Sequence, residues 1–246
     1  MCPEPLKSLS PLVEIWVAPV DTRLRPDDWL DGDERAHFER LRLAADRGRF
    51  LASRVLLRCA RSRCAPVPTR AWRFARLATG AWRILAPAET TLRFSIAHTD
   101  GVAVVAVRRG AAVGVDVESL DRPLPPEALA AVLTAAEKTA LSALPSADRG
   151  RALVTLWTAK EAYAKFIGLG AAVDFTQVEV TLSPLRVRAL TPQIPRDSAP
   201  TSPEPVDVEA RHFVVGTAVH LVTFAAFHSA DSPLQTSWRT LESPCF

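Results

Sequence analysis

The stretch "GVDVES", residues 114–119, ends an apolar run in which the valines alternate with other residues. This alternation predicts a β-strand with its valines on one face and Asp116 and Glu118 together on the other. Two neighbouring carboxylates repel each other, and burying either is unfavourable without a counter-charge. Three interpretations are open: a solvent-facing sheet edge, an ion pair with an arginine, or a divalent cation held by oxygen ligands.

The composition is that of a globular chain with a substantial core. The 246 residues are 48% hydrophobic and 23% charged, enough for one large domain or two small ones. No apolar run reaches the roughly 18 residues of a membrane span, and the N-terminal residues lack the features of a secretion signal. The four cysteines show no zinc-binding spacing. We therefore expect free thiols in a cytoplasmic protein, with no membrane partner.

Basic residues are concentrated in the first half of the chain. Residues 1–114 carry 19 Lys and Arg against 12 Asp and Glu, although the net charge of the whole chain is only +3. Most of the excess lies in residues 35–63, which contain nine arginines and two acidic residues. This asymmetry predicts a polyanionic ligand for the basic segment.

Hydrophobic periodicity predicts an α+β fold of two similar lobes, each with helices followed by an antiparallel meander sheet. The first lobe covers residues 1–114 and the second residues 115–246, with a proline-rich surface loop at 191–206. Thr134 stands three residues before Glu137 and predicts a capping box at a helix start. The other expected helices cover residues 32–64, with a joint near residues 44–45, and residues 147–167. The expected strands are 12–19, 71–77, 81–87, 91–98, 102–109, 111–118, 175–182, 185–190, 212–218 and 219–227.

The long second-lobe helix contains "WTAKEAYAKFIGLG", residues 157–170. The spacing of Trp157, Glu161 and Lys165 puts them on one stripe, and Lys160 precedes the glutamate. An exposed helix with one Glu–Lys pair and a core tryptophan would account for this pattern. However, the chain has four lysines against 26 arginines, and two of the four flank Glu161. This bias suggests a need for compact point charges here.

Together, "GVDVES" and "WTAKEAYAKFIGLG" resemble the paired signatures of the 4′-phosphopantetheinyl transferases, G-[VI]-D-x-E and W-x-x-K-E-[AS]-x-x-K. Two further segments are similar to family motifs: "LRFSIAHTDGVAVVAV", residues 92–107, and the basic helix "DRGRFLASRVLLR", residues 46–58. The resemblance is to the larger, pseudo-dimeric bacterial type. It implies two lobes related by a pseudo-twofold axis, with the active cleft between them and the chain acting as a monomer.

Such enzymes move the phosphopantetheine arm of coenzyme A onto a serine of an apo carrier protein and release 3′,5′-ADP. The resemblance implies that Asp116, Glu118 and Glu161 bind Mg²⁺, an ion that prefers hard oxygen ligands. Glu161, or a metal-bound water beside it, would accept the serine proton. Lys160 and Lys165 would hold phosphate oxygens.

Further ligands of coenzyme A are implied by the same resemblance. His98 matches the family's phosphate-binding histidine, so the implied catalytic set is Glu161, Lys165 and His98. Thr99 would add a hydroxyl donor, and Arg49 would reach the 3′-phosphoadenosine end. Arg35 and Arg42 follow the same seven-residue spacing as Arg49 and are candidates to line one groove, or to lie on a solvated helix face.

The chain departs from the family pattern in two places. Ala97 precedes the histidine where the family usually has serine. The G-[KR]-P element before that strand is missing, and "TGAWRILAP", residues 79–87, offers only Arg83 as a replacement cation. Residues 119–150 are expected to help dock the carrier, which could be of the fatty-acid, polyketide or nonribosomal-peptide kind.

Two other functions compete with this interpretation. Another Mg²⁺-dependent phosphotransferase, or a nuclease, could use the same acids, although a nuclease usually needs more acidic ligands for a second metal. A non-enzymatic nucleic-acid-binding protein would explain the arginines. It would leave Asp116, Glu118 and Glu161 without a role, so we expect no nucleic-acid partner.

Overall fold

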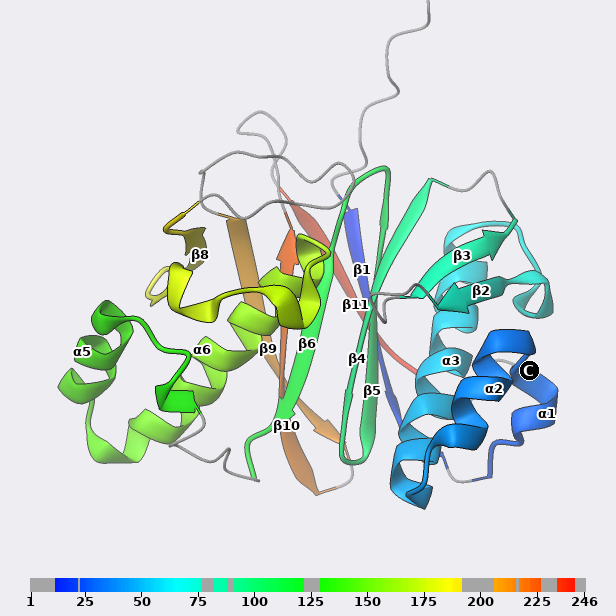
Figure 1. Cartoon of the computed structure of the whole chain (residues 1–246), viewed down its shortest axis with the longest axis horizontal. Coiled ribbons are helices and arrows are strands. Elements are labelled where there is room, and N and C mark those ends of the chain that lie inside the picture. The colour runs from blue at the N-terminus through cyan, green and yellow to red at the C-terminus, as the bar shows by residue number, and fades with distance from the viewer. Residues whose placement is uncertain are drawn as a thin grey trace, which may run out of the picture.

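The computed structural model describes residues 12–21, 23–76, 82–87, 91–121, 129–191, 206–215, 217–226 and 234–241. These residues form an α+β fold, as predicted (Figure 1). The helices are α1 (Pro26–Trp29), α2 (Gly32–Arg40), α3 (Ala44–Cys64), α5 (Ala135–Ala143) and α6 (Ser146–Phe166). The strands are β1 (Leu12–Pro19), β2 (Arg73–Arg76), β3 (Trp82–Ala86), β4 (Leu92–Thr99), β5 (Val102–Arg109), β6 (Gly114–Ser119), β7 (Val178–Leu182), β8 (Leu185–Ala189), β9 (Val206–Val215), β10 (Ala218–Ala226) and β11 (Gln235–Thr240).

The strands form two main sheets and a separate hairpin. The first sheet has the order β11-β1-β5-β4, the second has the order β6-β10-β9-β8-β7, and β2 pairs only with β3. Neighbouring strands are antiparallel except β1 and β11, which run parallel.

The two sheets pack against each other, and each carries one long helix on its outer face. Alternation along the strands explains this layering. In β1, Ile15 belongs to the core between the sheets, whereas its neighbour Trp16 packs toward α3. Helix α6 covers the outer face of the second sheet through a third apolar cluster. The helices α1–α3 and α5–α6 therefore lie on opposite sides of the molecule (Figure 1).

Strand β6 confirms the prediction made for residues 114–119, and its valines face the core between the sheets. It is the edge strand of the second sheet and lies beside β4, the edge strand of the first. The Val115 N–H donates to the Ser95 hydroxyl at 3.0 Å and so ties the two edges together.

A glycine allows β6 and α6 to touch. A Cβ atom added to Gly114 would lie 1.9 Å from the carbonyl oxygen of Ala162 and 2.6 Å from the amide nitrogen of Phe166. No side chain fits at such distances, so Gly114 sets the separation between the strand with the paired acids and the helix with Glu161.

The helices agree closely with their predictions. The expected joint in residues 32–64 falls between α2 and α3, at residues 41–43. The capping box is present, since the Thr134 side chain accepts from the Glu137 N–H and the Glu137 carboxylate accepts from the Thr134 N–H. Cys59 and Cys64 are reduced thiols. Among the described residues, no helix is both long and apolar enough to cross a membrane.

Strand β11 belongs to the segment 115–246 but lies in the first sheet. The division of the chain into two lobes stays a prediction, whereas the expected meander of the first lobe is wrong. The first sheet is not a meander, because β1 pairs with β5 and β11 instead of the next strand. The central residues of β1 are buried, so the backbone N–H and C=O groups along both of its edges need hydrogen-bond partners, which β5 and β11 supply. Residues 192–205 of the expected proline-rich loop lie outside the described residues, and the pseudo-twofold relation stays a prediction.

Candidate active site

A pocket of about 540 Å³ opens where β4 and β6 meet. Its walls come from α3, β3, β4, β6, the end of α6 and the turn that follows α6. The lining residues are Ser53, Arg54, Trp82, Phe94, Ser95, Ile96, Ala97, His98, Asp116, Val117, Glu118, Lys165, Gly168, Leu169 and Gly170. The pocket thus combines groups from segments far apart in the sequence.

Asp116 is buried at this pocket, with only 7% of its surface exposed. Lys165 Nζ donates to Asp116 Oδ1 at 2.7 Å and to the Val115 carbonyl oxygen at 3.1 Å. Burial raises the pKa of Asp116, and the Lys165 charge opposes that rise. The solvent-facing interpretation is therefore wrong for Asp116, and the counter-charge is a lysine of α6 instead of an arginine.

Glu118 follows on the same face of β6. The Trp157 side chain and the Thr99 hydroxyl, which lies 3.5 Å from Glu118 Oε2, both hydrogen-bond to its carboxylate. Burial raises the pKa of Glu118, and the charge of Asp116 raises it further. Trp157 also packs edge-on against Phe175, so it supports the site and is more than a core side chain.

Glu161 lies on α6 and is half-buried. Burial raises the pKa of Glu161, and the charge of Asp116 again adds to the rise, while Lys165 opposes it. Asp116 therefore acts electrostatically on both glutamates. Glu161 is not among the residues that line the pocket, although the charges of Asp116 and Lys165 act on its carboxyl group.

The donor chemistry of these acids fits a hard divalent cation. Asp116 Oδ2 is buried and has no hydrogen-bond partner among the described residues, and an oxygen in that state suits a metal ion. Burial is the main cause of the raised pKa values, and the charge of Asp116 adds to the rise for Glu118 and Glu161. A cation would relieve this repulsion. Across the described ranges, no three acidic, histidine or cysteine side chains are gathered in metal-binding geometry, and Lys165 is the cation nearest to Asp116.

Lys160 does not reach the pocket, which corrects the expectation that it holds phosphate oxygens. Its side chain is fully buried, and Nζ forms an ion pair with Glu137 at 2.8 Å. Nζ also donates to the carbonyl oxygens of Val132, Phe175 and Val178 at 2.9, 2.8 and 2.6 Å. With these partners the ammonium is fully satisfied, so its role is to fasten α6 to the segments around it.

His98 lies near the end of β4 and lines the pocket together with Asp116 and Glu118. As a whole residue His98 is exposed. The protein atoms around its ring nevertheless exclude part of the water, and this burial lowers the pKa of His98. The positive charge of Lys165 lowers that pKa further. His98 and Lys165 are therefore close enough to act on one anionic ligand.

The remaining predicted ligands lie outside the pocket lining. Arg49 forms ion pairs with Asp46 and Asp100 at the start of α3. Arg35 pairs with Asp27. The other candidates, Arg42, Arg83 and Thr99, are also absent from the lining, and the first two are exposed.

Sequence reasoning missed two of the residues that line the pocket. Arg54 and Trp82 lie there together, and the guanidinium carbon of Arg54 is 4.2 Å from the centre of the indole. Arg54 is one of nine arginines in residues 35–63, and no spacing distinguishes it from the others. No sequence pattern singled out Trp82, which stands directly before Arg83.

Comparison with known proteins links the chain to one enzyme family. The profile of the 4′-phosphopantetheinyl transferase superfamily matches residues 112–216. The 4′-phosphopantetheinyl transferase HetI of Nostoc sp. is 30% identical over 192 residues, which cover 74% of this chain and 79% of HetI. A phosphopantetheinyl transferase of Thraustochytrium sp. is 28% identical over 189 residues, covering 69% of this chain and 66% of that protein.

One solved structure has a weaker similarity. It is a holo-(acyl-carrier-protein) synthase of Bacillus anthracis in complex with coenzyme A (3′,5′-ADP), which is 20% identical and covers 47% of this chain and 95% of its own. The TM-score is 0.36, too low to support an argument about this chain.

Proposed function

The chain belongs to the 4′-phosphopantetheinyl transferase superfamily, and we propose that it transfers the phosphopantetheine arm of coenzyme A to a serine of an apo carrier protein. The observation that carries this proposal is the meeting of Asp116, Glu118, Lys165 and His98 around one pocket. Acids and cations gathered around one pocket suit a reaction at a pyrophosphate, where positioning and neutralisation of oxygen charge supply most of the catalysis.

The proposed roles follow from the positions of the side chains. Lys165 and His98 would hold phosphate oxygens, since both lie on the pocket wall. Glu161 would accept the proton of the carrier serine, because its raised pKa favours proton uptake more than that of an exposed glutamate. The serine oxygen would then bond to the phosphorus next to pantetheine, and the pyrophosphate P–O bond would break to release 3′,5′-ADP.

Magnesium is the metal that we propose for this site. Asp116, Glu118 and Glu161 would hold it, and Asp116 Oδ2 is the oxygen that lacks another partner among the described residues. When bound, Mg²⁺ would neutralise the developing charge on the pyrophosphate. The pocket is lined by residues from both halves of the chain, which supports a monomeric enzyme. Residues 119–150, which continue from β6, are the proposed docking region for the carrier.

Mass spectrometry of a carrier protein tests the proposed function. The full chain is incubated with coenzyme A, Mg²⁺ and each of several apo carriers of the fatty-acid, polyketide and nonribosomal-peptide kinds. We expect one carrier to gain one phosphopantetheine arm on its serine, and no gain with that serine changed to alanine. No gain with any carrier, together with salt-sensitive retention of the chain on DNA, would favour a nucleic-acid-binding protein instead.

A further inference from the structure

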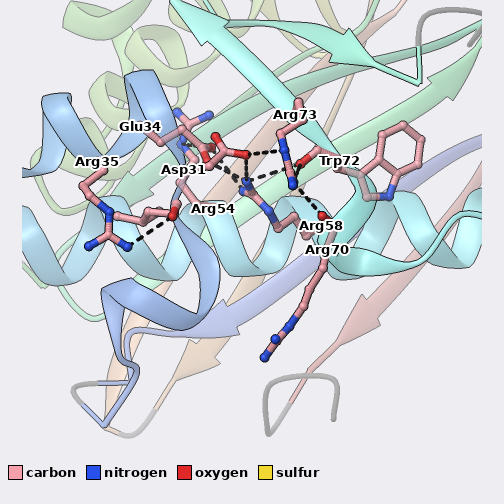
Figure 2. Close-up of polar contacts among 9 residues, drawn as sticks. Asp31, Glu34, Arg35, Arg54, Arg58, Arg70, Trp72 and Arg73 are labelled. Atoms are coloured by element: carbon pink, nitrogen blue, oxygen red, sulfur yellow. Dashed lines mark hydrogen bonds and ion pairs between the residues drawn. The ribbon is translucent and has the colours of Figure 1, made fainter.

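Figure 2 shows how a buried polar contact fastens two elements of this chain. Arg58 of α3 donates to both carboxylate oxygens of Glu34 of α2, at 3.1 and 2.5 Å. His220 of β10 makes a buried polar contact close to the pocket. Only 1% of its surface is exposed. It is not among the residues that line the pocket, so any effect of His220 on a ligand bound there must pass through another residue.

The side chain of His220 points toward the first sheet. Val222, two residues further along β10, belongs to the core between the sheets, and alternate residues of a strand share a face. The Nε2 atom of His220 lies 3.1 Å from the carbonyl oxygen of Asp100, which is in the turn that joins β4 to β5. Because a carbonyl oxygen only accepts, Nε2 carries the hydrogen and donates it.

The turn between β4 and β5 is attached to α3, to the segment after β1 and to β10. The Val20 N–H donates to the Gly101 carbonyl oxygen at 2.9 Å, and the Arg49 guanidinium forms an ion pair with the Asp100 side chain. Of these three attachments, only that of His220 comes from the second sheet. The second sheet also contains β6 with its paired acids, so this hydrogen bond joins the turn to the sheet that carries them.

This turn follows directly after the residues of β4 that reach the candidate site. His98 lines the pocket, and the Thr99 hydroxyl lies 3.5 Å from Glu118 Oε2. The link from β6 to the Ser95 hydroxyl lies farther back along β4. The shorter hydrogen bond from His220 therefore fixes the end of β4 that carries His98 relative to the second sheet.

The second ring nitrogen shows why a histidine is useful at this position. Nδ1 of His220 is buried and has no hydrogen-bond partner among the described residues. A buried polar atom without a partner is unfavourable, and an apolar side chain facing the core would avoid that penalty. What histidine adds here is the hydrogen bond donated by Nε2.

We infer that His220 is a positioning residue, whose Nε2–H holds the β4–β5 turn so that His98 stays at the pocket beside Asp116 and Glu118. This inference rests on the proposed function, in which His98 holds a phosphate oxygen of coenzyme A. Loss of the hydrogen bond would leave the carboxylates in place and release the end of β4. Binding of coenzyme A should then weaken through His98.

Calorimetric titration of coenzyme A tests this role with two substitutions. His220→Leu removes the donor and fills a similar volume, whereas His220→Gln keeps an N–H donor at the same number of bonds from the backbone. We expect the Kd to rise about threefold to tenfold in His220→Leu, the effect of one lost hydrogen bond, and to stay within about twofold in His220→Gln. An unchanged Kd in His220→Leu would refute the inference. His212→Leu, the same change at an exposed position of β9, is the matched control and should leave the Kd unchanged.

A double substitution separates positioning from a general loss of structure. If His220 acts through His98, His220→Leu should weaken binding in the wild-type background but add less than about twofold in the His98→Gln background. An equal weakening in both backgrounds would refute the inference. A lower Tm with an unchanged Kd would also refute it, because the role of His220 would then be structural only.

The hydrogen bond itself has a spectroscopic signature. NMR of the imidazole nitrogens, assigned with His220→Gln, should show the hydrogen on Nε2, and a hydrogen on Nδ1 alone would refute the inference. Should His220→Leu fail to fold, His220→Asn decides, because its shorter side chain cannot reach the turn: its Kd should rise where that of His220→Gln does not. If neither amide variant folds, the role is structural and the inference is refuted. Failure of the wild type to bind coenzyme A would instead refute the proposed function.

Discussion

At the scale of single residues, the charge of Asp116 raises the pKa of both Glu118 and Glu161. We expect Asp116→Asn to lower the rate of carrier modification at least about a hundredfold, because the metal loses a ligand and Lys165 loses its counter-charge. The fold should persist, since asparagine keeps the shape of the side chain. Carrier mass gain over time and thermal unfolding measure the two effects. Asp148→Asn, an exposed position on α6, should change neither, and near-normal turnover in Asp116→Asn would exclude a metal role.

His98 should respond to coenzyme A through its protonation. Burial and the Lys165 charge hold the pKa of His98 below its ordinary value of 6.5 in the free protein. An anionic phosphate stabilises the protonated ring, so binding should raise the pKa of His98 and take up a proton. Affinity for coenzyme A should therefore increase as the pH falls from 8 to 6. NMR titration of the ring protons, assigned with His98→Gln, measures the pKa, and a fall on binding would place the phosphate elsewhere.

The sequence predicted the side chains near the carboxylates better than those farther away. The alternation of "GVDVES" put Asp116 and Glu118 on one face, and helical spacing put Lys165 on one stripe with Glu161. The expectation that these two segments meet came from the family resemblance.

The same spacing put Lys160 off that stripe, but the family resemblance gave both lysines one role. No local pattern shows that the Lys160 ammonium is surrounded by carbonyl oxygens. Arg54 could not be distinguished from the neighbouring arginines, because ion pairing of their side chains depends on contacts between segments that are distant in the sequence.

At the scale of elements, the contact between β6 and α6 depends on Gly114. We expect Gly114→Ala to lower the free energy of unfolding by about 3 kcal/mol or more, because the added methyl group has no space beside the α6 backbone. Any folded fraction should show little transfer activity, since β6 must move away from Glu161. Chemical denaturation and the carrier assay measure both effects.

Gly150→Ala provides the control for that substitution. Gly150 lies in α6, and a Cβ atom there would meet nothing within 4 Å. Alanine at an open helix position should stabilise the protein by about 0.4–1 kcal/mol and leave activity unchanged. Equal stability changes at positions 114 and 150 would contradict the packing explanation.

The two lysines of α6 should separate stability from activity. Lys160→Met leaves Glu137 buried without its ion-pair partner, so we expect the free energy of unfolding to fall by about 3–5 kcal/mol. Lys165→Met leaves Asp116 without its counter-charge, but this ion pair borders the pocket and Lys165 is partly exposed. The loss of stability should therefore be smaller than for Lys160→Met, whereas coenzyme A binding and transfer should weaken. Denaturation curves and calorimetry of both variants measure this. The reverse pattern, with Lys160 governing affinity, would restore the original expectation for Lys160.

Local patterns predicted most helices and strands, because their apolar residues recur with the spacing of a helix or a strand. Strands β1 and β5 and helices α3 and α6 begin and end within one or two residues of their expected limits. Strand β11 was missed because "QTSWRT" is mostly polar and lacks an alternating apolar face. Its place in the sheet comes from the open edge of β1, which no local pattern reveals.

At the scale of the whole molecule, β11 forms one edge of the first sheet and covers β1. Strand β11 pairs with β1 over residues 235–240, and Trp238 packs against Phe224 of the second sheet. We expect truncation after residue 233 to destabilise the chain by at least about 2 kcal/mol, because an apolar strand edge and part of the core are exposed. Hydrogen exchange should show the loss first in β1 and β5, and unchanged protection there would contradict this role for β11.

The arrangement of the two sheets, not either sheet alone, creates the candidate site. Strands β4 and β6 are edge strands of different sheets, and the pocket opens only where those edges meet. The family resemblance implied a cleft between two halves of the chain. The order of the strands depends on contacts between segments a hundred residues apart, so the sequence pattern could not supply it.

A crystal structure of the full chain grown with coenzyme A and Mg²⁺ would show whether this pocket is the site of transfer. We predict coenzyme A in the pocket between β4 and β6, phosphate oxygens against His98 and Lys165, and a metal ion bound by Asp116. Coenzyme A bound on another surface, with Asp116 still paired only to Lys165, would contradict the proposed site.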